Sequence, residues 1–202
     1  MNNQSPVLEL KNVSKKLGHK TILSDLTLRI NHSSTTVITG PNGAGKTTLL
    51  KIAANLISID SGKIIRNNDC SVYYVGNIPG LYSKLSVLEN LLFFSNLNSN
   101  QSEKIMGLLQ DWGLNKFTNS LVGVLSKGQQ IRLALLIATS FSNKLIILDE
   151  PSAFLDDDAV SILLRFLTTN SNNNSFLMAT HDSIRLSNHN FESYHLIDGQ
   201  FK

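Results

Sequence analysis

Residues 40–47 combine glycines, a lysine and a threonine at a spacing that could bind phosphate. They match the pattern Gly-x-x-x-x-Gly-Lys-Thr. Glycines let successive backbone N–H groups curl around a β-phosphate, and the start of a following helix adds partial positive charge. We expect Lys46 to neutralise the β- and γ-phosphates and the hydroxyl of Thr47 to ligate Mg²⁺. The nucleotide-binding residues predicted here are Gly40, Pro41, Asn42, Gly43, Ala44, Gly45, Lys46, Thr47 and Thr48.

A glycine-rich turn without chemistry is the alternative for this loop, and its neighbours argue against that alternative. Residues 37–39 read Val-Ile-Thr, a short strand pattern that runs straight into Gly40. Residues 46–57 have helical spacing, with one apolar side formed by Leu49, Leu50, Ala53 and Leu56. The order of strand, glycine loop and helix is the setting that a phosphate-binding loop requires.

Two carboxylates, Asp149 and Glu150, directly follow the apolar run at residues 145–148. Open α/β sheets bind their ligands at the carboxyl ends of such strands. We expect Asp149 to hold the coordination shell of Mg²⁺. Glu150 is expected to accept a proton from an attacking water, a role that depends mainly on geometry. An Asp-Glu pair after a strand can be an ordinary solvated turn, but the phosphate-binding loop upstream favours the chemical role.

Residues 125–130 read Leu-Ser-Lys-Gly-Gln-Gln. Ser126, with Gln129 three positions later, predicts a capping box at the start of a helix. A helix N-terminus that carries a serine hydroxyl and bare N–H groups can also bind an anion. The capping role and the anion-binding role are compatible.

The elements that must position these groups can be outlined from the apolar pattern. Nearly all-apolar runs at residues 145–148 and 176–179 predict parallel strands buried on both faces, with a helix over about 156–167 between them. Alternating apolar and polar residues at 7–10 and 26–30 predict half-buried strands of an antiparallel layer. The sequence therefore predicts an α/β fold.

A helical insertion is predicted between the phosphate-binding loop and Ser126. Apolar positions recur at helical spacing over residues 85–97 and 102–112, and a further helix is expected from residue 126 to about 141. Near the end of the sequence, the pair Asp198-Gly199 is typical of the turn of a hairpin.

Composition limits the classes of function. The 202 residues are 42% hydrophobic and 16% charged, which predicts one domain with its own core. The formal net charge is +3, but basic residues occur singly or in pairs such as Lys15-Lys16, so no nucleic-acid partner is expected. The single cysteine, Cys70, cannot form an internal disulfide or a cysteine-based zinc site, and this fits a reducing compartment.

No apolar run approaches the roughly 20 residues needed to cross a bilayer. The first residues, Met-Asn-Asn-Gln-Ser, lack the basic and apolar regions of a secretory signal. We therefore expect a soluble chain that stays in the compartment where it is made.

The motifs and their order resemble the ATP-binding subunits of ABC transporters over essentially the whole chain. Residues 125–129 are similar to the family signature Leu-Ser-Gly-Gly-Gln. Residues 151–156, Pro-Ser-Ala-Phe-Leu-Asp, resemble the family's D-loop, and Thr180-His181-Asp182 resembles its switch-histidine segment. The resemblance implies a P-loop NTPase fold of the ABC ATPase type. Such a fold has a RecA-like parallel-sheet core, an N-terminal antiparallel β layer and a short helical subdomain.

That fold implies one ABC domain over residues 1–202, with a core lobe at 1–76 and 142–202 and a helical subdomain at 77–141. The resemblance also implies a homodimer that binds two ATP with Mg²⁺. The resemblance implies that Ser126, Gly128 and Gln129 contact the γ-phosphate held by the opposite subunit. It also implies that His181 senses the γ-phosphate, although a lone histidine at a strand end is more often structural, and that Asn77 acts beside Glu150 in catalysis.

Three positions depart from the family pattern. Asn77 stands where most members have the Q-loop glutamine, so its side chain is one methylene shorter. Lys127 replaces the first signature glycine. Leu17 lies near where many members stack an aromatic ring on adenine, which leaves the preference for ATP over GTP open.

The segment over residues 75–81, followed by residues 85–91, is similar to the ATPases of cytochrome c biogenesis haem exporters, as are the short length and the doubled Gln129-Gln130. This resemblance implies ATP hydrolysis that energises separately encoded integral membrane subunits, with haem contacted only through them. It places the chain peripherally at the cytoplasmic face of the inner membrane, or at the matrix face if an organelle encodes it.

Two alternatives remain open. One is the ATPase of another ABC exporter, for a lipid or a small molecule. The other is a soluble ABC protein that acts on DNA or the ribosome. The short insertion between Lys46 and Ser126 has no room for the long coiled coil of DNA-repair members, and 202 residues hold one ATPase domain where ribosome-associated members join two.

Overall fold

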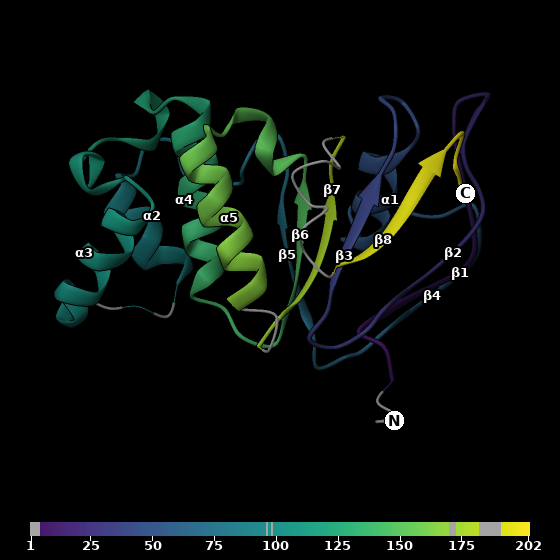
Figure 1. The fold of residues 1–202 in the computed structure, drawn as a ribbon, viewed down its shortest axis with the longest axis horizontal. Coiled ribbons are helices and arrows are strands. Elements are labelled where there is room, and N and C mark those ends of the chain that lie inside the picture. The colour runs from purple at the N-terminus through teal and green to yellow at the C-terminus, as the bar shows by residue number, and fades with distance from the viewer. Residues whose placement is uncertain (1–4, 96, 98, 170–172, 182–190) are drawn as a thin grey trace. The chain divides into compact units, whose positions relative to one another are not determined.

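The computed structural model describes residues 5–95, 97, 99–169, 173–181 and 191–202 (Figure 1). Contacts divide the chain into two compact units. The first, called here the sheet unit, comprises Met1–Tyr74, Asn143–Glu150 and Ser171–Lys202. The second, the helical unit, comprises Val75–Ser142 and Pro151–Asn170. The sequence predicted a core lobe at residues 1–76 and 142–202 and a helical subdomain at residues 77–141. These bounds stay a prediction.

An antiparallel sheet opens the fold, as predicted. In the described chain its strands lie in the order β2-β1-β4, with β1 at Leu8–Leu17, β2 at Lys20–Ile30 and β4 at Ser61–Arg66. β1 pairs with both neighbours, and Leu10 lies opposite Leu28 on one side and Ile64 on the other. β4 was not predicted, because its sequence, Ser-Gly-Lys-Ile-Ile-Arg, has no regular alternation of apolar and polar residues.

A second sheet contains the predicted buried strands. Among the described residues its order is β5-β6-β7-β3-β8-β9. The strands span Ser71–Val75 (β5), Lys144–Asp149 (β6), Ser175–Ala179 (β7), Thr35–Thr39 (β3), Glu192–Ile197 (β8) and Gln200–Phe201 (β9). β3 runs parallel to β7 and β8, and β6 runs parallel to β7, which confirms the parallel-sheet core. The carboxyl ends of β3, β6 and β7 therefore share one edge of the sheet.

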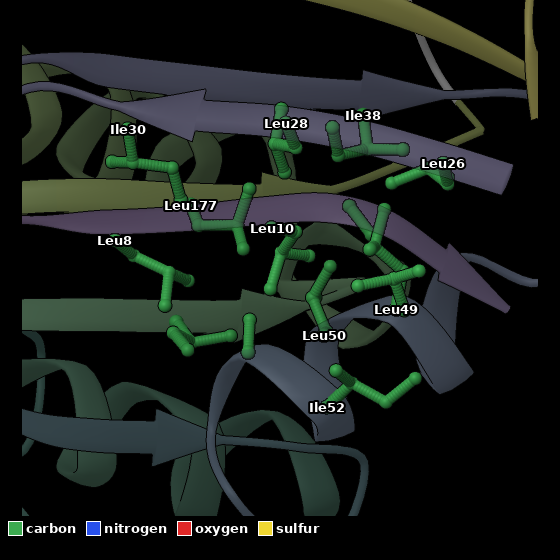
Figure 2. Close-up of a cluster of buried hydrophobic side chains, with 14 of the residues drawn as sticks. Leu8, Leu10, Leu26, Leu28, Ile30, Ile38, Leu49, Leu50, Ile52 and Leu177 are labelled. Carbon is green, nitrogen blue, oxygen red and sulfur yellow. The ribbon is translucent and has the colours of Figure 1, made fainter. Parts of the chain in front are cut away.

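The core of the sheet unit is a cluster of leucine and isoleucine side chains (Figure 2). The inward positions of β1 and β2 contribute to it, as do Ile38 of β3 and Leu177 of β7. Helix α1, Lys46–Ala53, buries Leu49 and Leu50 in the same cluster. Burying a leucine contributes roughly 1.5–3 kcal/mol, so this cluster fixes the helix that follows the phosphate-binding loop.

The helical unit contains α2 (Val87–Phe94), α3 (Ser102–Asp111), α4 (Lys127–Thr139) and α5 (Asp157–Thr169). Short 3-10 turns lie at Ser99–Gln101, Asn115–Phe117, Val122–Val124 and Pro151–Phe154. The predicted helical insertion is thus confirmed. Trp112, just after α3, makes an edge-on ring contact with Phe166 of α5 at 6.3 Å between centroids.

None of the helices in the described ranges combines the length and the apolar character needed to cross a membrane.

The predicted hairpin turn at Asp198-Gly199 joins β8 to β9, which confirms that prediction. The turn also supports the phosphate-binding loop. The amide of Gly199 donates to the carbonyl of Ala44 at 3.2 Å, and the carbonyl of Gly199 accepts from the amide of Ser24 in β2 at 3.1 Å. Gly199 therefore ties the loop to the antiparallel sheet.

Replacing Gly199 with alanine is expected to destabilise the protein more than replacing Gly18. Both residues have positive φ, 76° and 60°, which strains an alanine by roughly 1–2 kcal/mol. A Cβ at Gly199 would also lie 2.3 Å from the carbonyl oxygen of Ile22, whereas no heavy atom lies within 4 Å of one at Gly18. We expect a total loss of about 2–5 kcal/mol for Gly199→Ala. Urea unfolding measures both variants, and equal losses would contradict this packing.

Candidate functional site

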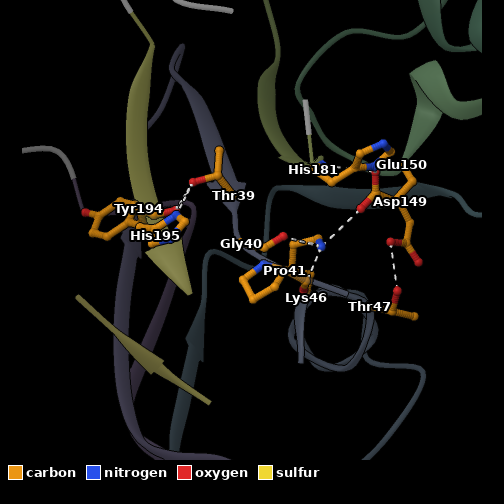
Figure 3. Close-up of polar contacts among 10 residues, drawn as sticks. All are labelled: Thr39, Gly40, Pro41, Lys46, Thr47, Asp149, Glu150, His181, Tyr194 and His195. Carbon is orange, nitrogen blue, oxygen red and sulfur yellow. Dashed lines mark hydrogen bonds and ion pairs between the residues drawn. The ribbon is translucent and has the colours of Figure 1, made fainter. Parts of the chain in front are cut away.

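The phosphate-binding loop starts where β3 ends and finishes where α1 begins (Figure 3). Gly40 has φ 146°, and a Cβ there would lie 2.1 Å from the carbonyl oxygen of Leu196 in β8. Gly45, the N-cap of α1, has φ 107°, and a Cβ there would lie 2.9 Å from the side chain of Leu23. Glycine is therefore required at both ends of the loop, and the predicted residues 40–48 form the expected loop and first helical turn.

Lys46 lies in that first turn and is 6% exposed. Its Nζ donates to the carbonyl oxygens of Gly40 at 2.8 Å and Pro41 at 3.2 Å. It also forms an ion pair with Oε1 of Glu150 at 3.2 Å. The ammonium group is therefore fixed at the mouth of the loop by two carbonyls and one carboxylate (Figure 3).

Asp149, at the end of β6, is 7% exposed and accepts two hydrogen bonds. The hydroxyl of Thr47 donates to Oδ1 at 3.0 Å, and the hydroxyl of Tyr74 in β5 donates to Oδ2 at 2.9 Å. The two residues predicted to hold Mg²⁺, Thr47 and Asp149, are therefore neighbours. Burial, and next the negative charge of Asp149, raise the pKa of the Tyr74 phenol well above its ordinary value.

Glu150 has a left-handed backbone, with φ 51°, and its amide donates to the carbonyl of Ala179 in β7 at 3.0 Å. Its carboxylate connects two predicted site residues. Oε1 pairs with Lys46, and Oε2 accepts from the backbone amide of His181 at 3.2 Å and lies 2.8 Å from His181 Nδ1. The exposed imidazole of His181 thus lies beside the carboxylate expected to act as a base. Asp182 lies outside the described residues.

In the helical unit, the predicted capping box at Ser126 is confirmed. The Ser126 hydroxyl accepts from the amide of Gln129 at 3.3 Å, and Gln129 Oε1 accepts from the amide of Ser126 at 2.9 Å. A Cβ at Gly128 would lie 2.5 Å from the carbonyl oxygen of Phe154, so this glycine is needed for a close backbone approach. The Nζ of Lys127 lies 5.8 Å from the centroid of the Phe154 ring.

Ser126, Gly128 and Gln129 line a cavity of about 470 Å³. Asp156, the last residue of the predicted D-loop, also lines it, as does Arg132, which was missed in the sequence. The Arg132 guanidinium pairs with both carboxylate oxygens of Asp156, at 2.6 and 2.5 Å. Asp156 Oδ1 also accepts from the amide of Ala159 in α5 at 2.9 Å. A charged residue in the otherwise apolar middle of α4 was the signal that could have singled out Arg132.

The remaining sequence-based candidates lie at the surface. Asn77 is exposed and belongs to the helical unit, in the segment after β5. Leu17 is 53% exposed at the end of β1. Tyr74 was missed, because neither it nor the adjacent Tyr73 carries a signal for the carboxylate, 75 residues later, that Tyr74 contacts.

Sequence comparison identifies relatives over most of the chain. A family model described as ABC transporter matches residues 23–153. A cytochrome c biogenesis ATP-binding export protein, CcmA, from Tatumella citrea is 33% identical over 88% of this chain and 90% of its own length. The protein of the same name from Xylella fastidiosa is 37% identical over 73% of this chain and 74% of its own.

Solved structures agree with the sequence comparison. An ATP-binding subunit of an ABC transporter superposes with a TM-score of 0.84 at 25% identity, covering 97% of this chain and 88% of that one. The dimeric ATP-binding cassette MJ0796, bound to ADP and Pi, gives a TM-score of 0.79 at 25% identity over 96% of both chains. The family match spans more than half of the chain, and the chain has the same fold as these ATP-binding subunits. The chain therefore belongs to the ABC transporter family, as one of its ATP-binding and ATP-hydrolysing subunits.

Proposed function

We propose that this chain hydrolyses ATP to energise separately encoded integral membrane subunits that export haem, or a haem-linked species, for cytochrome c biogenesis. The observation that carries the proposal is the identity of 33% to a CcmA export protein over about nine tenths of both chains. The chain would act at the cytoplasmic face of the membrane, bound through those subunits, and haem would contact only them. No nucleic-acid partner is part of the proposal.

The phosphate-binding loop, residues 40–48, would hold the triphosphate of ATP, with Lys46 against the β- and γ-phosphates. Thr47 Oγ1 and Asp149 Oδ1 are two oxygen atoms that can ligate a metal ion, and they lie 3.0 Å apart. This pair fits Mg²⁺, which binds one or two protein oxygens together with phosphate oxygens and water. When bound, Mg²⁺ supplies positive charge that neutralises the phosphate oxygens. Thr47 and Asp149 would orient it, as the match to the family motif suggests.

Glu150 is proposed as the catalytic base, and its carboxylate forms an ion pair with Lys46. A γ-phosphate entering the loop would replace Glu150 as the partner of Lys46, because charge-assisted bonds to phosphate are strong. The released carboxylate could then take a proton from the attacking water. His181, in contact with Oε2, would orient the carboxylate and sense the γ-phosphate.

The Ser126 helix start would bind the γ-phosphate held by a second copy of the chain. The Ser126 oxygen accepts its capping bond, so the hydroxyl hydrogen can still donate to a phosphate. Gly128 would add a backbone N–H group of the first turn of α4, and Gln129, whose own amide donates to Ser126, would contribute through its side chain. The solved dimer of a related cassette supports pairing of two copies. Asn77 would contact Mg²⁺ or the attacking water with a side chain shorter than glutamine.

Cells that make this protein provide the test of the export function. Without the chain, covalently attached haem in c-type cytochromes should disappear from haem-stained denaturing gels. Wild type should restore the haem, and Lys46→Ala should not. An affinity-tagged chain purified from detergent-solubilised membranes should retain integral membrane subunits. Unchanged cytochromes together with a retained membrane partner would contradict the haem assignment and indicate export of another substrate.

Lys46→Ala should weaken ATP binding, because it removes the cation matched to the β- and γ-phosphates. A hydrogen bond to a charged group contributes about 1.5–3 kcal/mol, so the dissociation constant should rise roughly tenfold to 150-fold. Calorimetric titration measures the change. Lys51→Ala, in the last turn of the same helix, is the control and should bind ATP normally. Equal affinity of Lys46→Ala and Lys51→Ala would rule out the role of Lys46.

Glu150→Gln should bind ATP and leave it uncleaved, because an amide keeps the shape of the side chain but cannot take the proton. ATP binding should become more favourable by roughly 1 kcal/mol, since a neutral amide competes less well than a carboxylate with the phosphates for Lys46. Size-exclusion chromatography with Mg-ATP should show more dimer than for wild type, and adding Ser126→Arg should abolish that excess. Glu192→Gln, at the start of β8, is the charge-matched control. Rapid turnover by Glu150→Gln would exclude the base assignment.

A further inference from the structure

The carboxylate of Asp149 is held from both sides by hydroxyl groups. Thr47 donates to Oδ1 at 3.0 Å, as Figure 3 shows, and Tyr74 donates to Oδ2 at 2.9 Å. Tyr74 lies on β5, and Asp149 ends the neighbouring strand β6. With 7% of Asp149 exposed, little water is available to replace either partner.

The two hydroxyls differ in what else they can do. A threonine hydroxyl rotates freely and offers lone pairs to a cation, so Thr47 can exchange its bond to Oδ1 for a metal contact. The Tyr74 hydroxyl is attached to a ring that packs against the hydrophobic core of the sheet unit. Because that packing fixes the ring, the phenol hydroxyl is held against Oδ2 and keeps donating to it. Oδ2 therefore remains occupied, and Oδ1 is the oxygen left for a cation.

We propose that Tyr74 is a positioning residue of the magnesium site, which fixes the Asp149 carboxylate so that Oδ1 faces Thr47 and the cation. The proposal rests on the proposed role of Asp149 in holding Mg²⁺. The terminal torsion of an aspartate is broad, so the carboxylate has no strong orientation of its own. Hydrogen-bond partners of metal ligands commonly supply that orientation.

Tyr74→Phe removes the hydroxyl and keeps the ring that packs against the core. The affinity of the protein for a fluorescent ADP analogue is measured first in EDTA and then at increasing Mg²⁺ concentrations. An ADP analogue is used so that the measurement does not depend on hydrolysis. We expect unchanged affinity in EDTA, because no phosphate-loop contact is altered. The Mg²⁺ concentration that gives half of the metal-dependent change should rise about tenfold or more, the usual effect of losing a partner of a metal ligand.

Tyr194→Phe is the matched control. The Tyr194 hydroxyl also donates to a carboxylate of the same sheet, Oε1 of Glu192 at 2.7 Å, and its pKa is likewise raised, to about 12, first by burial. We expect its Mg²⁺ dependence to equal that of wild type. A Tyr74→Phe curve that coincides with the Tyr194→Phe curve would overturn the proposal, as would equal weakening with and without Mg²⁺, which indicates a general structural defect.

Asp149→Asn separates this proposal from the proposed function. If the magnesium site is correctly assigned, Asp149→Asn should lose most of the Mg²⁺ effect on nucleotide affinity. Normal Mg²⁺ dependence of Asp149→Asn would refute the metal role of Asp149, and the role of Tyr74 would fall with it. A lost effect in Asp149→Asn beside a normal curve for Tyr74→Phe would leave the site intact and refute the positioning role alone.

Discussion

At Gly40 and Gly45 in the phosphate-binding loop, and at Gly199 beside it, neighbouring segments approach so closely that there is no space for a side chain. A Cβ at Gly40 would meet the carbonyl of Leu196, and a Cβ at Gly199 would meet the carbonyl of Ile22. A Cβ at Gly45 would also lie 3.0 Å from that Ile22 oxygen. These contacts fix the loop between β2 and β8. The buried leucines of α1 anchor the helix that follows the loop in the hydrophobic core. The placement of Lys46, and with it the ion pair to Glu150, depends on this packing.

The positive charge of Lys46 is stabilised by groups of the site itself. Lys46 is buried, and burial of an ammonium group is costly unless carbonyls and a carboxylate stabilise it. Gly40, Pro41 and Glu150 supply those partners. Nucleotide binding thus exchanges one set of polar contacts for another, and affinity is set by the difference between them.

The sequence was sufficient for features that depend on local pattern. These features are the glycine spacing of the loop, the apolar runs of β6 and β7, the capping box at Ser126 and the turn at Gly199. Each involves residues within about eight positions of one another. Features that depend on distant partners were missed. The half-exposed positions of β4 and β5 have no clear period, and Arg132 and Tyr74 meet carboxylates 24 and 75 residues away.

The position of β8 has a consequence for protein synthesis. The loop and α1 leave the ribosome early, but β3 has β8 as a neighbour, and Gly199 joins the loop to β2. At translation rates of about 5–20 residues per second, residue 199 follows residue 46 by on the order of ten to thirty seconds. For that interval the nascent chain carries an unpaired edge on its central strand, a template for wrong pairing. A chaperone that shields β3 during elongation would protect the segment on which nucleotide binding depends.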